Sequence, residues 1–200
     1  MRYAIYWLPH HQLPLYQDGQ NWFEQTHRFH SIIEEIKSSL SYYDFSPALK
    51  IPQKYGFHCE LLSPFYLKPD IQEQDIFKLC TQISKTMTKC DIKMCLTAEG
   101  KSLLLQSYHK NNLIIDLKKK LYDALMGMIE FGTKTYYDKH SEFQIVLSNT
   151  SDKTLHEDLT KIAHHYWQPL LRNTFEVNHF NLCYQKNKDM PFCNLMRFDF

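Results

Sequence analysis

The sequence predicts an α+β fold built on a mainly antiparallel sheet. Strand-like and helix-like segments alternate along the 200 residues, and short turns join several neighbouring strands into hairpins. Hairpins pair strands antiparallel, whereas a parallel sheet needs a long crossover after each strand. No linker, low-complexity run or short repeat divides the chain. We therefore expect one domain over residues 1–200.

The first elements follow from hydrophobic pattern and capping residues. Tyr3–Leu8 is aromatic and aliphatic and stops at a proline, which is typical of a buried strand. A helix is expected around Leu15–Gln25. A second is expected over Ser31–Leu40, because Ser31 followed by Glu34 matches a capping box. The prolines at positions 47 and 52 then predict a loop.

Later elements alternate in the same way. In chain order we expect a strand over Gly56–Leu67, a helix over Pro69–Lys89, strands over Ile92–Thr97 and Lys101–Gln106, a helix over Asn112–Phe131, a strand over Tyr136–Ser148, a helix over Ser151–Leu171, and strands over Phe175–Tyr184 and Phe192–Phe200. The Glu99-Gly100 pair is a hairpin turn signal. Hairpins thus dominate among the strands, as the α+β class requires.

Charge, cysteine and hydropathy patterns exclude several classes of protein. Lys and Arg total 23 against 22 Asp and Glu, so the positive field of a duplex nucleic-acid binder is missing. No apolar run approaches the roughly 20 residues that span a bilayer, and the start lacks a signal-peptide core. The six cysteines form no C-x-x-C pair, which favours a cytoplasmic protein without a disulfide framework. The run Lys118–Lys120 is expected to be a solvated helix face.

Three segments together resemble a known family. The first, Arg2–Pro9, reads Arg-Tyr-Ala-Ile-Tyr-Trp-Leu-Pro, and the second, Tyr55–Phe65, opens Tyr-Gly-Phe-His. The third runs from Leu182 through Pro191-Phe192 to Arg197-Phe198. In order and spacing these segments resemble the phosphonate-metabolism branch of the two-histidine (LigT-like) phosphoesterase superfamily.

The resemblance implies two pseudo-symmetric lobes of mainly antiparallel sheet with helices outside, forming a central groove. In that family each lobe contributes one His-x-Thr/Ser strand to the groove. Opening a cyclic phosphodiester needs a base for the attacking water and an acid for the leaving oxygen, and histidines serve both near neutral pH. The hydroxyls lie two residues along the same strand, so they face the same groove and donate to phosphate oxygens. No cofactor is implied.

The chain departs from that pattern at three of the four groove positions. His58 stands where the first histidine is expected, but Glu60 replaces the first hydroxyl. In the second strand Gln144 replaces the histidine and Val146 the hydroxyl. Glutamine has no titratable proton, valine cannot donate, and a carboxylate repels another negative charge by about 1 kcal/mol at roughly 4 Å in water. His58 and Glu60 are therefore the candidate catalytic residues.

A different register for the second strand stays open. His140-Ser141-Glu142 repeats the His-x-Glu pattern of His58 and Glu60, but it lies four residues before the matching position, roughly 13 Å along a strand. The same offset disfavours a metal site built from these side chains, and no metal is expected. The candidate groove and ligand-binding residues are accordingly Gln144, Val146, Tyr3, Tyr55, His140 and Glu142.

The leading hypothesis is a diverged two-histidine phosphoesterase-like protein, with lost or altered cyclic phosphodiesterase activity. Its groove is expected to bind a small phosphorylated or nucleotide-like ligand, or a protein partner. A second hypothesis is an active hydrolase that uses His58 and Glu60 as an acid–base pair. A third is a pure protein-interaction module in which the groove has no role.

Overall fold

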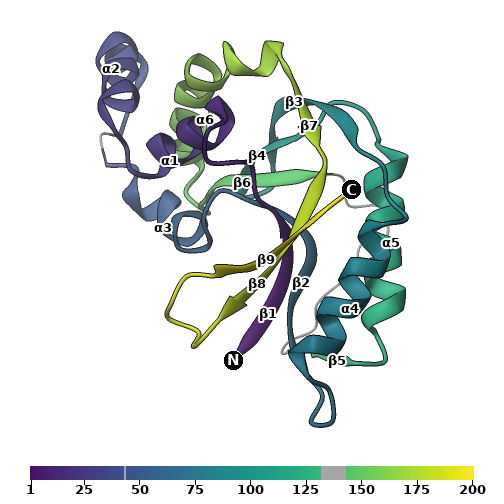
Figure 1. Ribbon diagram of the computed structural model, residues 1–200. Helices are drawn as coiled ribbons and strands as arrows, with labels where there is room; N and C mark the ends of the chain where they lie inside the picture. Colours follow the sequence, from purple (N-terminus) through teal and green to yellow (C-terminus); the bar gives the residue numbers. More distant parts are fainter. Residues whose placement is uncertain (43, 132–142) are drawn as a thin grey trace.

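The chain folds around a curled sheet in which every strand pair is antiparallel (Figure 1). The computed structural model describes residues 1–42, 44–131 and 143–200. Its strands are β1 (Arg2–Trp7), β2 (Cys59–Leu67), β3 (Cys90–Glu99), β4 (Ser102–Ser107), β5 (Ile129–Phe131), β6 (Gln144–Asn149), β7 (Thr174–Val177), β8 (His179–Gln185) and β9 (Cys193–Asp199). Together with the helices, this sheet confirms the predicted α+β class.

Helices cover the outside of the sheet. They are α1 (Pro14–Phe23), α2 (His27–Ile36), α3 (Ser46–Tyr55), α4 (Glu73–Ser84), α5 (Asn112–Leu125) and α6 (Lys153–Trp167), with short 3-10 turns η1 (Lys37–Ser39) and η2 (Leu170–Arg172). In Figure 1, α4 and α5 lie together on one side of the molecule, while α1, α2, α3 and α6 gather on the other. Within the described residues, no helix is both long and apolar enough to cross a membrane. All six cysteines are free thiols.

Among the described residues, the sheet divides into a half of four strands, from β7 to β6, and a half of five, from β2 to β9 with β5. The strand order is β7-β3-β4-β6-β2-β1-β8-β9, and β5 pairs with β2 outside this series. The halves meet where β6 pairs with β2, through Cys59 and Ile145. Both of these side chains are fully buried, so the junction is anchored in the core. Two half-sheets joined by one strand pair are the pseudo-symmetric lobes that the sequence resemblance implies.

An aromatic cluster fastens the helices to the β6 half. The ring of Trp22 in α1 packs edge-on against Tyr166 of α6, and its indole N–H donates to the carbonyl of Leu147 in β6 at 3.0 Å. Phe57, just before β2, stacks on Trp167 of α6 at 5.7 Å between ring centroids. All five residues are buried. The cluster therefore holds the segment that enters β2 against the half-sheet that contains β6.

Two local predictions in the first quarter of the chain are wrong. The helix predicted from Ser31 begins at His27, because Phe29 extends its buried face, and the Ser31 hydroxyl instead donates to the His27 carbonyl at 2.9 Å. The predicted proline loop is helix α3. Its first proline lies in the first turn, where no N–H is needed, and the buried side of Pro52 faces β6 with the helix. Tertiary packing thus overrides both local signals.

Other helix and strand boundaries differ from the predicted ones because a new strand begins where the chain gains a new pairing partner. The helix predicted over Asn112–Phe131 stops at Leu125, and β5 follows it to pair with β2. The predicted strand Phe175–Tyr184 breaks at Asn178, since β7 pairs with β3 whereas β8 pairs with β1. Strand β6 is described from Gln144 onward, and positions 136–142 of its predicted range lie outside the described residues.

Gly19 in α1 provides a test of how tightly the entry to β2 is packed. A Cβ at this position would lie 2.3 Å from Cγ of Phe57, so Gly19→Ala should lower the free energy of unfolding by about 1–3 kcal/mol despite the helix propensity of alanine. Gly127→Ala, where nothing lies within 4 Å, is the control and should change it by less than about 0.5 kcal/mol. Urea unfolding measures both, and equal effects would contradict the packing.

Candidate functional site

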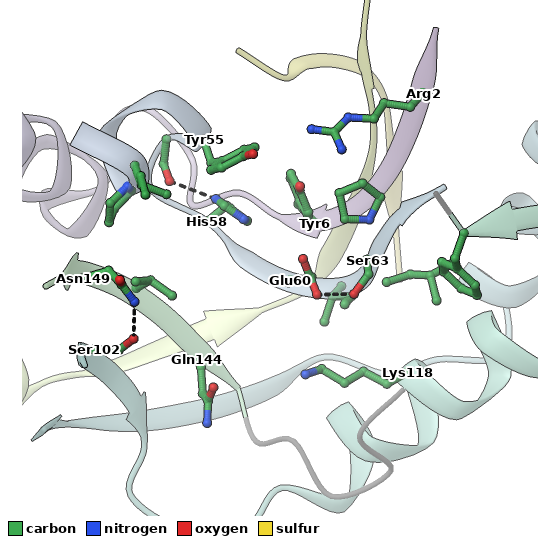
Figure 2. A pocket seen from close by; sticks show the side chains of 18 of the residues that line it. Arg2, Tyr6, Tyr55, His58, Glu60, Ser63, Ser102, Lys118, Gln144 and Asn149 are labelled. Atoms are coloured by element: carbon green, nitrogen blue, oxygen red, sulfur yellow. Dashed lines mark hydrogen bonds between the residues drawn. The ribbon is translucent and has the colours of Figure 1, made fainter. Parts of the chain in front are cut away.

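A cavity of about 590 Å³ opens where the two half-sheets meet (Figure 2). Strands β1, β2 and β6 form its floor, and the ends of α3 and α5 form its walls. The lining residues are Arg2, Tyr6, Ile51, Pro52, Tyr55, Gly56, His58, Glu60, Leu61, Leu62, Ser63, Pro64, Ser102, Lys118, Tyr122, Phe131, Gln144, Val146 and Asn149. Polar and charged groups thus share the cavity with several aromatic and aliphatic side chains.

The register at the junction relates the two walls to each other. Cys59 pairs with Ile145, so a two-fold axis through this pair relates each residue of one strand to the residue at the same offset in the other. The axis relates His58 to Gln144 and Glu60 to Val146, and all four line the cavity. This register favours the alignment in which Gln144 takes the position related by symmetry to that of His58.

His58 is held in one tautomer by the backbone beside it. Its Nδ1 lies 2.9 Å from the carbonyl oxygen of Gly56, and Gly56 takes a φ of +81° at the end of α3. Because a carbonyl oxygen only accepts, Nδ1 carries the proton and Nε2 of the neutral ring keeps its lone pair. The ring packs against Tyr6 at 4.0 Å between centroids. Such an imidazole can accept one proton from water or a hydroxyl group.

The environment of His58 favours the neutral ring. Desolvation of the imidazole lowers the pKa of His58, while the Gly56 carbonyl and the Glu60 carboxylate act in the opposite direction with smaller effect. The Gly56 carbonyl sets the tautomer, and burial decides the direction of the net change.

Glu60 and the opposite wall differ strongly in polarity. Glu60 is exposed to the cavity, and one of its carboxylate oxygens accepts a hydrogen bond from the Ser63 hydroxyl (Figure 2). Across the junction, Val146 leaves 41% of its surface exposed, and Gln144 carries only an amide. One wall therefore presents an imidazole and a carboxylate, and the other presents no titratable group at the corresponding positions.

The structure places the two predicted groove tyrosines differently. Tyr55 lines the cavity at the end of α3. Tyr3 does not line it, because alternation along β1 turns its ring into the core, where its hydroxyl donates to Glu73. Tyr6, three residues later and therefore on the other face, takes the groove position. His140 and Glu142 lie outside the described residues.

Two basic residues of the cavity were not predicted. Lys118, expected to be solvated, is only 7% exposed and reaches the cavity from α5 (Figure 2). Lys118 lies four residues after Ile114 and three before Leu121, so it is on the apolar face of that helix. This spacing could have predicted its burial, although it stands in a run of three lysines. Arg2 reaches the cavity from β1 because it shares a strand face with Tyr6.

Metal binding finds no support among the residues that can be placed. Within residues 1–42, 44–131 and 143–200, no three histidine, cysteine, aspartate or glutamate side chains gather closely enough to hold an ion. Two members of the disfavoured metal set, His140 and Glu142, fall outside these ranges. The chemistry that can be argued from the described cavity is hydrogen bonding, charge pairing and a single proton transfer at His58.

Comparisons with known proteins find similarity to solved structures but none to a family model or a curated sequence. No family model and no curated protein matches the sequence. The solved structure of E. coli LigT complexed with 3′-AMP is similar over 99% of this chain and 96% of that chain, with 9% identity and a TM-score of 0.46. A structure described as a phosphoesterase is similar over 99% and 97%, with 10% identity and a TM-score of 0.45.

The titration of His58 tests the description of the site. We expect nuclear magnetic resonance to give a pKa for His58 below the ordinary histidine value, so that the ring is neutral at pH 7. Glu60→Gln should lower the pKa of His58 further, because it removes a charge that favours the imidazolium. Glu176→Gln, at the far edge of the sheet, is the matched control and should leave it unchanged. A raised pKa in the wild type would contradict the buried, Gly56-bonded ring.

Proposed function

We propose that this protein is a diverged phosphoesterase-fold protein that binds a small phosphorylated or nucleotide-like ligand in its groove. Hydrolysis of the kind that uses two histidines is lost or altered. The observation that carries the proposal is the register at Cys59 and Ile145, which makes Gln144 the residue related by symmetry to His58. A single imidazole supplies either the base or the acid of a cyclic phosphodiester opening, but not both at once.

The contents of the cavity support a ligand with an anionic and an aromatic part. Arg2 and Lys118 bring two basic side chains to the lining, and Tyr55 of α3 and Tyr122 of α5 bring two partly exposed aromatic rings. Aromatic faces stack on bases without regard to sequence, and basic groups attract phosphate. A volume of about 590 Å³ suits a mononucleotide-sized molecule. The E. coli LigT structure holds such a molecule, 3′-AMP.

An active hydrolase is the second candidate, and one observation favours it. The neutral ring of His58 keeps an Nε2 lone pair, which is what a general base needs. Glu60 would then supply the proton for the leaving oxygen. This candidate requires a bell-shaped pH–rate profile that loses one limb in Glu60→Gln, and full activity of that variant would remove Glu60 from the mechanism.

Ligand binding and turnover separate these candidates. Adenosine monophosphates should raise the melting temperature of the protein, by the equivalent of about 2.7 kcal/mol at a hundredfold excess over Kd. Incubation with 2′,3′-cyclic AMP should give no product above the uncatalysed rate, because the second proton-transfer group is missing. Differential scanning fluorimetry and product chromatography measure the two quantities.

Three outcomes of these measurements distinguish the three candidate functions. Turnover that His58→Ala abolishes, and that the surface control His165→Ala keeps, would replace the proposal by the active hydrolase. A melting temperature that no phosphorylated compound changes would favour the pure interaction module. Binding without turnover supports the proposal.

A further inference from the structure

The hydroxyl of Tyr6 is a polar group at the cavity that has no hydrogen-bond partner among the described residues. The Tyr6 residue is only 2% exposed, and its ring is fixed between His58 at 4.0 Å and Phe192 at 5.3 Å between centroids. Among the described residues, no hydrogen bond reaches its hydroxyl, although the side chain lines the cavity. The ring is buried while the hydroxyl borders the cavity, so this hydroxyl is placed to donate to a ligand or an ordered water.

Arg2 approaches the same part of the cavity with its donors available. Its Nε donates to Gln185, whose fully buried amide in turn donates to the Met190 carbonyl, so the arginine is held from behind. The centre of its guanidinium lies 5.3 Å from the Phe192 ring. No described carboxylate pairs with Arg2. Its two terminal nitrogens can therefore bind an anion in the forked manner that suits phosphate.

Phe192 brings these groups together with a third. Besides Arg2 and Tyr6, the ring of Tyr55 lies 6.3 Å from Phe192 between centroids. In Figure 2 the Arg2 guanidinium, the Tyr6 hydroxyl and the Tyr55 ring face the same part of the cavity. The three sequence segments that carried the family resemblance therefore converge on one corner, which we call the Arg2 corner (Arg2, Tyr6, Tyr55 and Phe192).

The protonation of Tyr6 and the position of Glu60 agree with an anion in this corner. Burial raises the pKa of Tyr6 well above its ordinary value, and the nearby Glu60 carboxylate adds to this, so the hydroxyl stays a donor. Glu60 is the one carboxylate among the lining residues, and it lies in β2 next to the Cys59–Ile145 pair, where one of its oxygens accepts from the Ser63 hydroxyl. At the symmetry centre, which is the Cys59–Ile145 pair, the Glu60 carboxylate would repel a phosphate. The Val146 side chain there has no hydrogen-bond donor.

We propose that the ligand's phosphate sits in the Arg2 corner, bound by the Arg2 guanidinium and the hydroxyls of Tyr6 and Tyr55, and not between His58 and Gln144. The inference rests on the proposed function and adds where the anion binds and which residues select it. The site takes a phosphate monoester, whose terminal oxygens accept from the fork of Arg2 and from two phenols. His58 then faces the remainder of the ligand.

Calorimetric titration with two matched probes tests the location. The ratio of the Kd for adenosine to the Kd for adenosine 5′-monophosphate measures what the phosphate contributes. Arg2→Gln should reduce this ratio about tenfold or more, and Tyr6→Phe about threefold to tenfold, because each removes donors to a charged group. Arg2→Lys, which keeps the charge and loses the fork, should fall between Arg2→Gln and the wild type.

Controls on the same strand and of the same charge separate binding from folding. Tyr3→Phe removes the other β1 hydroxyl, which donates to Glu73 in the core, so it should lower the melting temperature and leave the ratio unchanged. Arg197→Gln, on β9 beside Asp199, should change neither by a measurable amount. Tyr6→Phe should melt like the wild type without ligand, since its hydroxyl has no partner among the described residues.

Two results would overturn the inference, and they are distinguishable. If Arg2→Gln and Tyr6→Phe keep the wild-type ratio while Gln144→Ala reduces it, the phosphate binds at the symmetry centre and only the location is wrong. If the wild type binds neither adenosine 5′-monophosphate nor inorganic phosphate, the proposed function fails as well.

Discussion

The pairing of Cys59 with Ile145 is the constraint on which the rest of the site depends. It joins the two half-sheets, and it sets which residues of β2 and β6 share the groove. Both side chains are fully buried, so a slip of one residue would turn a core side chain into the cavity and a polar one into the core. The aromatic cluster around Trp22 and Trp167 ties the helices to the same junction.

The asymmetry of the walls follows from this fixed register. Next to the pair, where a local two-fold axis relates the backbone positions, the two walls differ in their side chains. One lobe keeps His58, neutral and oriented by Gly56, beside Glu60, while the other presents Gln144 and Val146. The positive charge lies on Arg2 at the β1 side of the cavity and on Lys118, whose charge acts on Cys59 at the junction. At the positions next to the pair, the titratable groups thus lie on one wall only.

Much of the fold could be predicted because local patterns and tertiary structure agree there. The hairpin at Gly100 and the buried strand β1 follow from the hydrophobic pattern and the turn chemistry. Helix α3 could not, because its two prolines signal a loop, and only the tertiary structure shows that Pro52 is buried in a helix that packs on β6. In the site, Tyr6 was missed because the phase of alternation in an all-hydrophobic strand is ambiguous, and Tyr3 fits the pattern equally well. Lys118 was missed because its charge outweighed its helical position.

The most direct measurement is the hydrolysis of 2′,3′-cyclic AMP by a variant in which the symmetry-related positions are restored. The variant carries Glu60→Thr, Gln144→His and Val146→Thr, with Gln144→Asn in place of the histidine as its control. If the register is as described, this variant gains turnover that requires His58, and both the control and the wild type show none. Equal turnover by the wild type, or a folded restored variant that remains inert, would contradict the claim that the site lost its chemistry at these positions.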